Sequence, residues 1–189
     1  MKTIYVSGVF DLFHYGHLRL LKKCEEIAYT LTRTTREPVR LLIGVHNDKV
    51  CEKYKRKPIM TMNERASSII EIFELLGQRG IFVAVLLDAP LVETHELYEE
   101  KEIVKVLHAH SEEEDEHYST CYGVAMEMGI FQRLEYTGGI STCDIIDRVI
   151  ESTYETVWIY PENISIINLS RPATIVATTA GMGYLISDA

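Results

Sequence analysis

Hydrophobic and polar positions along this chain alternate between two periods. Short apolar runs, typical of buried strands, occur at residues 4–7, 41–45, 81–87 and 103–107, and a further strand is expected at residues 131–136. Between them apolar residues recur every three or four positions, as on one face of a helix, at residues 17–32, 63–76, 94–102, 120–128 and 141–152. Asn63 is expected to cap the second helix, and residues 49–57 are expected to form a basic loop before it.

Strands that alternate with helices predict an α/β fold. In this class a parallel sheet, joined by right-handed crossovers, is covered by helices on both faces. We expect the domain to span residues 1–154. A ligand of such a sheet lies beyond the carboxyl ends of the strands, where the strand order reverses. The loop after residues 4–7 is therefore expected to reach the ligand.

The helical period is lost after residue 154. Short β-prone runs, separated by proline and glycine, occur at residues 157–160, 164–169, 174–178 and 184–186. The pattern favours ordered β structure in residues 155–189, as an extension of the same unit. A hairpin on the sheet edge, an arm in a dimer and a partly disordered end remain open alternatives.

Charge and composition narrow the function. The net charge is −9 and the pI is near 5.3, which argues against a nucleic-acid binder, because such proteins hold phosphates with clustered Lys and Arg. An anionic substrate then needs a local basic site. The four cysteines form no Cys-x-x-Cys pair, so neither a zinc site nor a disulfide framework is indicated. Without a signal-peptide pattern or a bilayer-length apolar run, we expect a cytoplasmic protein that does not insert into membranes.

The first chemical motif runs from Gly8 to His17, directly after the first strand. A tight loop that leads into a helix aims backbone N–H groups at one spot. His14 and His17 are three residues apart, so both imidazoles can face that spot, and Gly16 keeps side-chain bulk from between them. A pair of ordinary polar loop histidines is the alternative, and zinc is disfavoured because further ligands are lacking nearby. The motif favours a polyphosphate site.

Two further segments add charge and backbone donors. Lys55 lies in the basic run Lys-Tyr-Lys-Arg-Lys and is expected to contact phosphate, with Arg65 as a second candidate. Glycines 138–139 follow the last strand, and Ser141 or Thr142 can cap the next helix, whose N-terminus is a second place for phosphate. The alternatives are a solvated basic loop and an ordinary helix start.

At these residues the chain resembles a known family. Gly-x-Phe-Asp-x-x-His-x-Gly-His, from Gly8 to His17, is similar to the signature of the nucleotidylyltransferase superfamily, whose sheet is Rossmann-like. Residues 139–145, Gly-Ile-Ser-Thr-Cys-Asp-Ile, are similar to the last signature of its cytidylyltransferase branch. Within that branch, residues 43–48, 54–60 and 89–92 resemble ethanolamine-phosphate cytidylyltransferases. The resemblance covers residues 4–150.

The resemblance implies a reaction and a set of roles. CTP and phosphoethanolamine would give CDP-ethanolamine and pyrophosphate, with Mg²⁺ on the CTP phosphates, in a homodimer. His14 and His17 would hydrogen-bond the α- and β-phosphates, and Lys55 would bridge the α-phosphate and the incoming phosphate. The other nucleotide contacts implied are Gly8, Val9, Phe10, Asp11, Gly16, Arg65, His108 near the base or acceptor, Gly139, Ile140, Ser141 and Thr142. For Asp11 the alternative is a structural role that orients the loop.

Three positions depart from the family pattern. Tyr136 stands where an arginine is expected to hold triphosphate, and Ala109 where an aspartate is expected to hold the amino alcohol. Leu91 replaces a tryptophan of choline-type enzymes, which removes a cation–π contact and argues against phosphocholine. Two alternatives stay open: transfer to another alcohol phosphate, such as phosphocholine or glycerol 3-phosphate, and an inactive nucleotide-binding homologue.

Overall fold

The computed structural model describes residues 1–76, 81–110, 115–155, 157–159, 174–177 and 184–187. The chain divides into two compact units, Met1–Ile140 and Ser141–Ala189. Helix α6 (Thr142–Glu155) belongs to the second unit, together with the C-terminal strands.

Five parallel strands form the sheet of the first unit. They are β1 (Lys2–Gly8), β2 (Val39–Val45), β3 (Phe82–Leu87), β4 (Ile103–Ala109) and β5 (Phe131–Leu134). Their order is β3-β2-β1-β4-β5, which confirms the predicted α/β, Rossmann-like sheet. The chain runs outward from β1 to β3 and returns to β4 on the other side of β1. The strand order thus reverses between β1 and β4, where ligands of such sheets bind.

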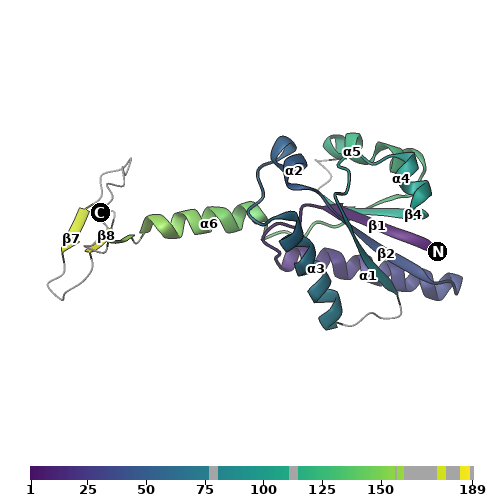
Figure 1. Cartoon of the computed structure of the whole chain (residues 1–189), viewed down its shortest axis with the longest axis horizontal. Coiled ribbons are helices and arrows are strands. Elements are labelled where there is room, and N and C mark those ends of the chain that lie inside the picture. The colour runs from purple at the N-terminus through teal and green to yellow at the C-terminus, as the bar shows by residue number, and fades with distance from the viewer. Residues whose placement is uncertain (77–80, 111–114, 156, 160–173, 178–183, 188–189) are drawn as a thin grey trace. The chain divides into compact units, whose positions relative to one another are not determined.

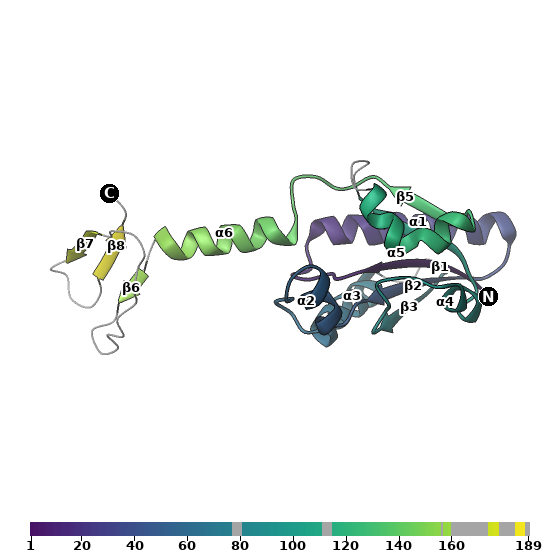
Figure 2. The ribbon, with the colours of Figure 1, turned by 90° about the horizontal axis from the view of Figure 1, so that it is seen from above.

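Helices cover both faces of this sheet (Figure 1). On one face, α1 (Tyr15–Thr35) and α3 (Met62–Leu76) pack on a core that includes Ile4 and Val6 of β1. On the other face, α4 (His95–Glu100) and α5 (Asp115–Glu127) pack against Tyr5. The alternation of side chains along β1 separates the two cores. Helix α1, with 21 residues, runs alongside the strands (Figure 2).

Two local predictions in the first unit are wrong. Helix α3 begins at Met62, and Thr61 caps it: Thr61 Oγ1 accepts the N–H of Glu64 at 3.3 Å, while Glu64 Oε2 accepts the N–H of Thr61 at 2.8 Å. Asn63 lies inside the helix. The basic loop is partly helical, because α2 (Asp48–Tyr54) begins where the Asn47 side chain accepts the N–H of Val50 at 2.7 Å.

The second unit combines α6 with a three-stranded antiparallel sheet. The strands are β6 (Val157–Ile159), β7 (Thr174–Ala177) and β8 (Tyr184–Ser187), in the order β6-β8-β7. Ordered β structure was predicted here, and three of the four β-prone runs overlap these strands; the run 164–169 lies outside the described residues. Ser141 caps α6, since its Oγ accepts the N–H of Asp144 at 3.1 Å. No helix in the described part of the chain is long and apolar enough to cross a bilayer.

Candidate active site

The two imidazoles of the first motif form the cap of α1. His14 Nδ1 accepts the N–H of Gly16 at 3.2 Å, and His17 Nδ1 accepts the N–H of His14 at 3.4 Å, which together make a capping box. The rings stack with their centroids 3.8 Å apart. Because each Nδ1 is an acceptor, a neutral ring carries its proton on Nε2. The backbone N–H groups of His14 and Gly16, which were expected to be available for phosphate, donate to the two imidazoles instead. The Nε2–H groups of the two rings are the donors that remain.

Burial keeps His17 neutral. Its ring contacts the aromatic rings of Phe10 and Phe13, each with its centroid 5.5 Å away. Burial, followed by the charges of His14 and Lys55, lowers the pKa of His17 to about 3, against an opposing effect of Asp11. At neutral pH His17 is an uncharged hydrogen-bond donor.

Lys55 acts on three histidines at the carboxyl ends of the strands. It follows α2 and is exposed. Besides His17, its charge lowers the pKa of His46, where burial is the larger cause, and of His108, where burial and His110 are larger. Lys55 thus shares one electrostatic environment with residues that follow β1 and β2 and with one on β4, as the predicted site requires.

His46 is a site residue that the sequence reasoning did not single out. It follows β2 directly, is 4% exposed, and its Nδ1 lies 2.9 Å from the carbonyl oxygen of Ala89. Its backbone N–H donates to the Gly8 carbonyl at 3.1 Å, which ties the end of β2 to the first motif. Its place at the carboxyl end of a parallel strand was the signal available in the sequence.

Asp11 has the structural role that the sequence left as an alternative. Its side chain is 1% exposed and accepts the N–H groups of Ile59 at 3.0 Å and Met60 at 2.9 Å. The Arg56 guanidinium lies 3.0 Å away. Burial opposes ionisation, but these three partners outweigh it and lower the pKa of Asp11. A buried carboxylate thus fastens the first loop to residues 56–60.

Arg65, the second candidate for a phosphate contact, is paired with groups of the protein itself. The side chain is fully buried. Its guanidinium donates to the carbonyls of Met60, Val9 and His46 and pairs with Asp48 Oδ1 at 2.6 Å. Arg65 therefore ties together the loops after β1 and β2 and the start of α3 from inside.

The start of the second signature lies beside the start of α1. A Cβ added to Gly16 would lie 3.0 Å from the His14 ring and 3.3 Å from Ile140 Cγ2, so a side chain has no room there. Gly139 has a φ of 83° and lies beside the hydroxyl of Tyr15, which donates to the Gly138 carbonyl at 3.5 Å. Ser141 and Thr142 belong to the second unit, at the cap and first residue of α6.

His108 lies in an aromatic cluster on β4. Its ring centroid is 4.6 Å from that of Tyr118, 4.8 Å from Tyr122 and 5.3 Å from His110. Burial, and then the charge of His110, lower its pKa to about 3. The hydroxyl of Tyr122 lies 3.0 Å from His108 Nδ1. This neutral imidazole lies on the strand next to β1, beside the reversal of strand order.

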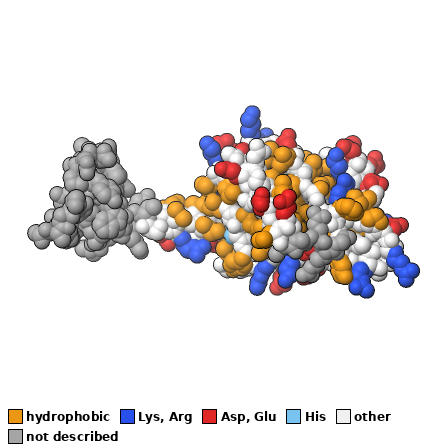
Figure 3. Space-filling view, turned by 60° about the horizontal axis from the view of Figure 1, so that its bottom comes forward, with side chains coloured by type: hydrophobic (Ala, Val, Ile, Leu, Met, Phe, Trp, Pro, Cys, Tyr) orange, Lys and Arg blue, Asp and Glu red, His pale blue; other side chains and the backbone are white. Residues whose placement is uncertain are grey.

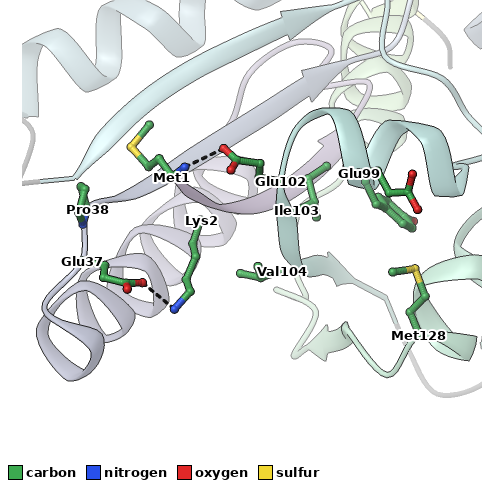
Figure 4. Close-up of a pocket in the computed structure, with 10 residues that line it drawn as sticks. Met1, Lys2, Glu37, Pro38, Glu99, Glu102, Ile103, Val104 and Met128 are labelled. Carbon is green, nitrogen blue, oxygen red and sulfur yellow. Dashed lines mark hydrogen bonds and ion pairs between the residues drawn. The ribbon is translucent and has the colours of Figure 1, made fainter.

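A cavity of about 520 Å³ lies at the opposite, amino ends of the strands (Figure 4). Met1 and Lys2 line it beside Ile103, and their ammonium groups pair with Glu102 and Glu37 at 2.7 Å. Because parallel sheets bind ligands at their carboxyl ends, this cavity is not the candidate active site. The surface drawn in Figure 3 intersperses acidic, basic and hydrophobic side chains. In the described residues no group of three or more His, Cys, Asp or Glu could hold a metal ion.

Comparison with known proteins agrees with the motif. The choline-phosphate cytidylyltransferase 2 of Arabidopsis thaliana is 32% identical over 150 residues, which cover 78% of this chain and 44% of that protein. The ethanolamine-phosphate cytidylyltransferase of Arabidopsis thaliana is 30% identical over 154 residues, covering 79% and 32%. The chain thus spans less than half the length of these relatives. A lipopolysaccharide core biosynthesis protein from Thermoplasma volcanium shares 18% identity at a TM-score of 0.48, over 72% of this chain and 98% of that chain. Residues 5–148 match the family described as Cytidylyltransferase-like, and the chain belongs to that family.

Proposed function

We propose that this protein transfers CMP from CTP to phosphoethanolamine, with release of pyrophosphate. One observation carries the proposal: two stacked imidazoles, His14 and His17, replace the backbone donors of α1 beside the reversal of strand order. Imidazole N–H groups held there by the backbone suit a polyphosphate, and the ammonium of Lys55 adds the positive charge that an acidic chain must supply locally. Relatives named for choline phosphate and for ethanolamine phosphate resemble the chain to a similar degree, so the acceptor is part of the proposal.

The chemistry needs no covalent intermediate. An oxygen of the acceptor phosphate attacks the α-phosphorus of CTP in line, and the bond to the β-phosphate oxygen breaks with its electron pair leaving on pyrophosphate. His14 and His17 donate from Nε2 to the α- and β-phosphate oxygens as charge develops there. Lys55 brings the two anionic substrates together. The backbone of Gly8, Val9 and Phe10 and that of Gly139 and Ile140, all in the first unit, would complete the phosphate contacts.

Mg²⁺ would arrive with CTP. The carboxylate of the first loop, Asp11, already binds two backbone N–H groups and Arg56, so it does not fit the part of a metal ligand. Phosphate oxygens and water are the ligands that Mg²⁺ retains in such sites. Bound Mg²⁺ would neutralise charge on the triphosphate, and the roles given to the side chains above do not depend on it.

Phosphoethanolamine is preferred to phosphocholine for the acceptor. Leu91 follows the Ala89-Pro90 pair, where an aromatic ring would be needed to hold a quaternary ammonium by a cation–π contact. A primary ammonium can instead be held by hydrogen bonds. Glycerol 3-phosphate, which offers hydroxyl groups, is the second acceptor to test.

An inactive nucleotide-binding homologue is the second candidate function. Two observations favour it: Tyr136 is half exposed where the resemblance expects an arginine, and the Ala109 side chain packs against the core where an aspartate is expected. Such a protein would bind CTP without turning it over.

Pyrophosphate release distinguishes these functions. The full chain is incubated with CTP, ATP or UTP and with phosphoethanolamine, phosphocholine or glycerol 3-phosphate. We expect release with CTP and phosphoethanolamine, and slower release with the other pairs. Release with another acceptor alone reassigns the substrate. CTP binding by calorimetry, without release from any pair, identifies the inactive homologue and overturns the proposal.

A further inference from the structure

A buried carboxyl group lies on the α4–α5 face of the sheet and has no part in the chemistry above. Glu93, between β3 and α4, is 1% exposed. Its Oε1 accepts the hydroxyl of Ser7 at 2.9 Å, and its Oε2 accepts the hydroxyl of Tyr98 at 2.5 Å. Both partners are neutral hydroxyls. Burial therefore dominates, and it raises the pKa of Glu93 to about 7 although the two hydroxyls oppose the shift.

A chain of hydrogen bonds leads from this carboxyl to the candidate site. Ser7 Oγ lies 3.3 Å from the hydroxyl of Tyr122, which lies 3.0 Å from His108 Nδ1. The four side chains come from β1, the segment before α4, α5 and β4. At the far side of the ring, His108 Nε2 is buried and has no hydrogen-bond partner among the described residues. A buried polar atom in that state costs free energy, which a ligand can recover by pairing with it.

The ionisation state of Glu93 sets which atom donates in each hydrogen bond of this series. An ionised carboxylate only accepts, so Ser7 donates to Glu93, Tyr122 donates to Ser7, and His108 donates from Nδ1 to Tyr122. The neutral ring then has a bare Nε2. When Glu93 is protonated, each bond reverses: Glu93 donates to Ser7, Tyr122 donates to Nδ1, and the ring proton lies on Nε2. One proton entering at Nε2 and passed along the chain to Glu93 accounts for the whole change.

We propose that Glu93 is a positioning residue that, through Ser7 and Tyr122, keeps the proton of His108 on Nδ1 and so makes Nε2 a hydrogen-bond acceptor for the head group of the acceptor substrate. This inference rests on the proposed function and narrows its substrate class. A hydrogen-bond acceptor at Nε2 can pair with the N–H of a primary ammonium or with a hydroxyl. A quaternary ammonium has no N–H to offer it.

Other titratable groups surround Glu93 and His108. Tyr5 of β1, Tyr98 of α4, and Cys121 and Tyr122 of α5 interact with Glu93, and burial raises the pKa of each. Those that act on His108 are His46 after β2, Lys55 after α2, His110 after β4, and Tyr118 and Tyr122 of α5. Removing the Tyr122 hydroxyl breaks the hydrogen-bonded link between Glu93 and His108 and leaves the other neighbours in place. The tautomer of His108 in such a variant therefore distinguishes the effect of Glu93 from theirs.

Nitrogen-15 NMR of the histidine rings in the full chain measures the tautomer without any substrate. For wild type we expect His108 to carry its proton on Nδ1 at pH 8 and on Nε2 at pH 6. Glu93→Gln should give one tautomer at both pH values, and the exposed Glu99→Gln on α4 should behave as wild type. Tyr122→Phe keeps the Glu93 carboxyl but removes the hydroxyl that links it to His108. This variant should also abolish the change of tautomer between the two pH values. A His108 tautomer that is the same at both pH values in wild type, or a change that persists in Tyr122→Phe, overturns the proposal.

An activity measurement separates this inference from the proposed function. At pH 8, Glu93→Gln should lose on the order of tenfold in kcat/KM for phosphoethanolamine relative to Glu99→Gln, because one hydrogen bond to the head group is lost. A tautomer change in wild type without turnover of any acceptor leaves the chain of hydrogen bonds standing and removes the proposed reaction. Full activity of Glu93→Gln at both pH values contradicts the positioning role itself.

Discussion

The imidazole of His17 accepts the backbone N–H of His14 and stacks on its ring, with the two centroids 3.8 Å apart. In an ordinary capping box a Ser or Thr and a Glu or Gln hold these positions. Here both positions are histidine, so the bonds that begin α1 also fix the tautomers of two N–H donors. Helix capping and phosphate recognition are therefore functions of the same two side chains.

His17→Ala should lower the turnover of CTP by on the order of 10²-fold or more, because a preorganised donor to the phosphates is lost. In His17→Gln the side-chain oxygen can still accept the N–H of His14, so the helix cap is kept. A lower rate in that variant is therefore not caused by loss of the cap. The exposed His95→Ala is the matched control and should keep the wild-type rate. The rates of wild type and of the three variants are measured as pyrophosphate release. A folded His17→Ala protein with the wild-type rate would remove His17 from the site.

Lys55→Ala should weaken catalysis, whereas Lys53→Ala should not. Both lysines are exposed and lie at the end of the same short helix, but the charge of Lys55 reaches His17, His46 and His108. Lys53 instead lies 4.8 Å from the Tyr54 ring. We expect kcat/KM to fall about 10²-fold for Lys55→Ala, as for other groups that neutralise transition-state charge. Equal kinetic effects of the two substitutions would contradict a specific role for Lys55.

Arg65→Met should act on stability. The buried guanidinium satisfies three backbone carbonyls and Asp48, and its removal leaves them without their donor. We expect the free energy of unfolding, from urea titration, to fall by about 3 kcal/mol. The exposed Arg33→Met on α1 is the control, with little change expected. Unchanged stability combined with weaker CTP binding would instead restore Arg65 as a phosphate ligand.

Acidification should destabilise the protein through His17. Its pKa is about 3 in the folded chain, against 6.5 for an ordinary histidine, so between these values the unfolded chain binds the additional proton. The stabilising contribution is complete above pH 6.5 and is lost as the pH falls toward 3. Relative to His17→Gln, wild type should lose about 2 kcal/mol of unfolding free energy between pH 7 and pH 5. Urea titrations at the two pH values measure this difference. Parallel losses in the two proteins would mean that His17 is not held neutral.

Local pattern was sufficient for the sheet and for the first motif. Strands β1 to β4 were visible as largely apolar runs, and the spacing of His14 and His17 sets the capping geometry directly. The roles of Arg65 and Glu93 were not visible, because their partners come from other loops and strands. Arg65 reaches Val9, 56 residues away, and Glu93 reaches Ser7, 86 residues away. From the sequence alone a charged side chain is predicted to be exposed, because the groups that pair with it are not known.

Phosphorus-31 NMR of the reaction mixture follows both substrates and both products of the proposed CMP transfer at once. The full chain, Mg²⁺, CTP and phosphoethanolamine are combined, with the His17→Ala chain as the parallel sample. We expect the CTP and phosphoethanolamine signals to decay together while the signals of CDP-ethanolamine and pyrophosphate grow. Both products should form at least about 10²-fold more slowly with His17→Ala. Intact CTP with wild type, or equal rates of product formation with both chains, would rule out the proposed role of His17 in CMP transfer.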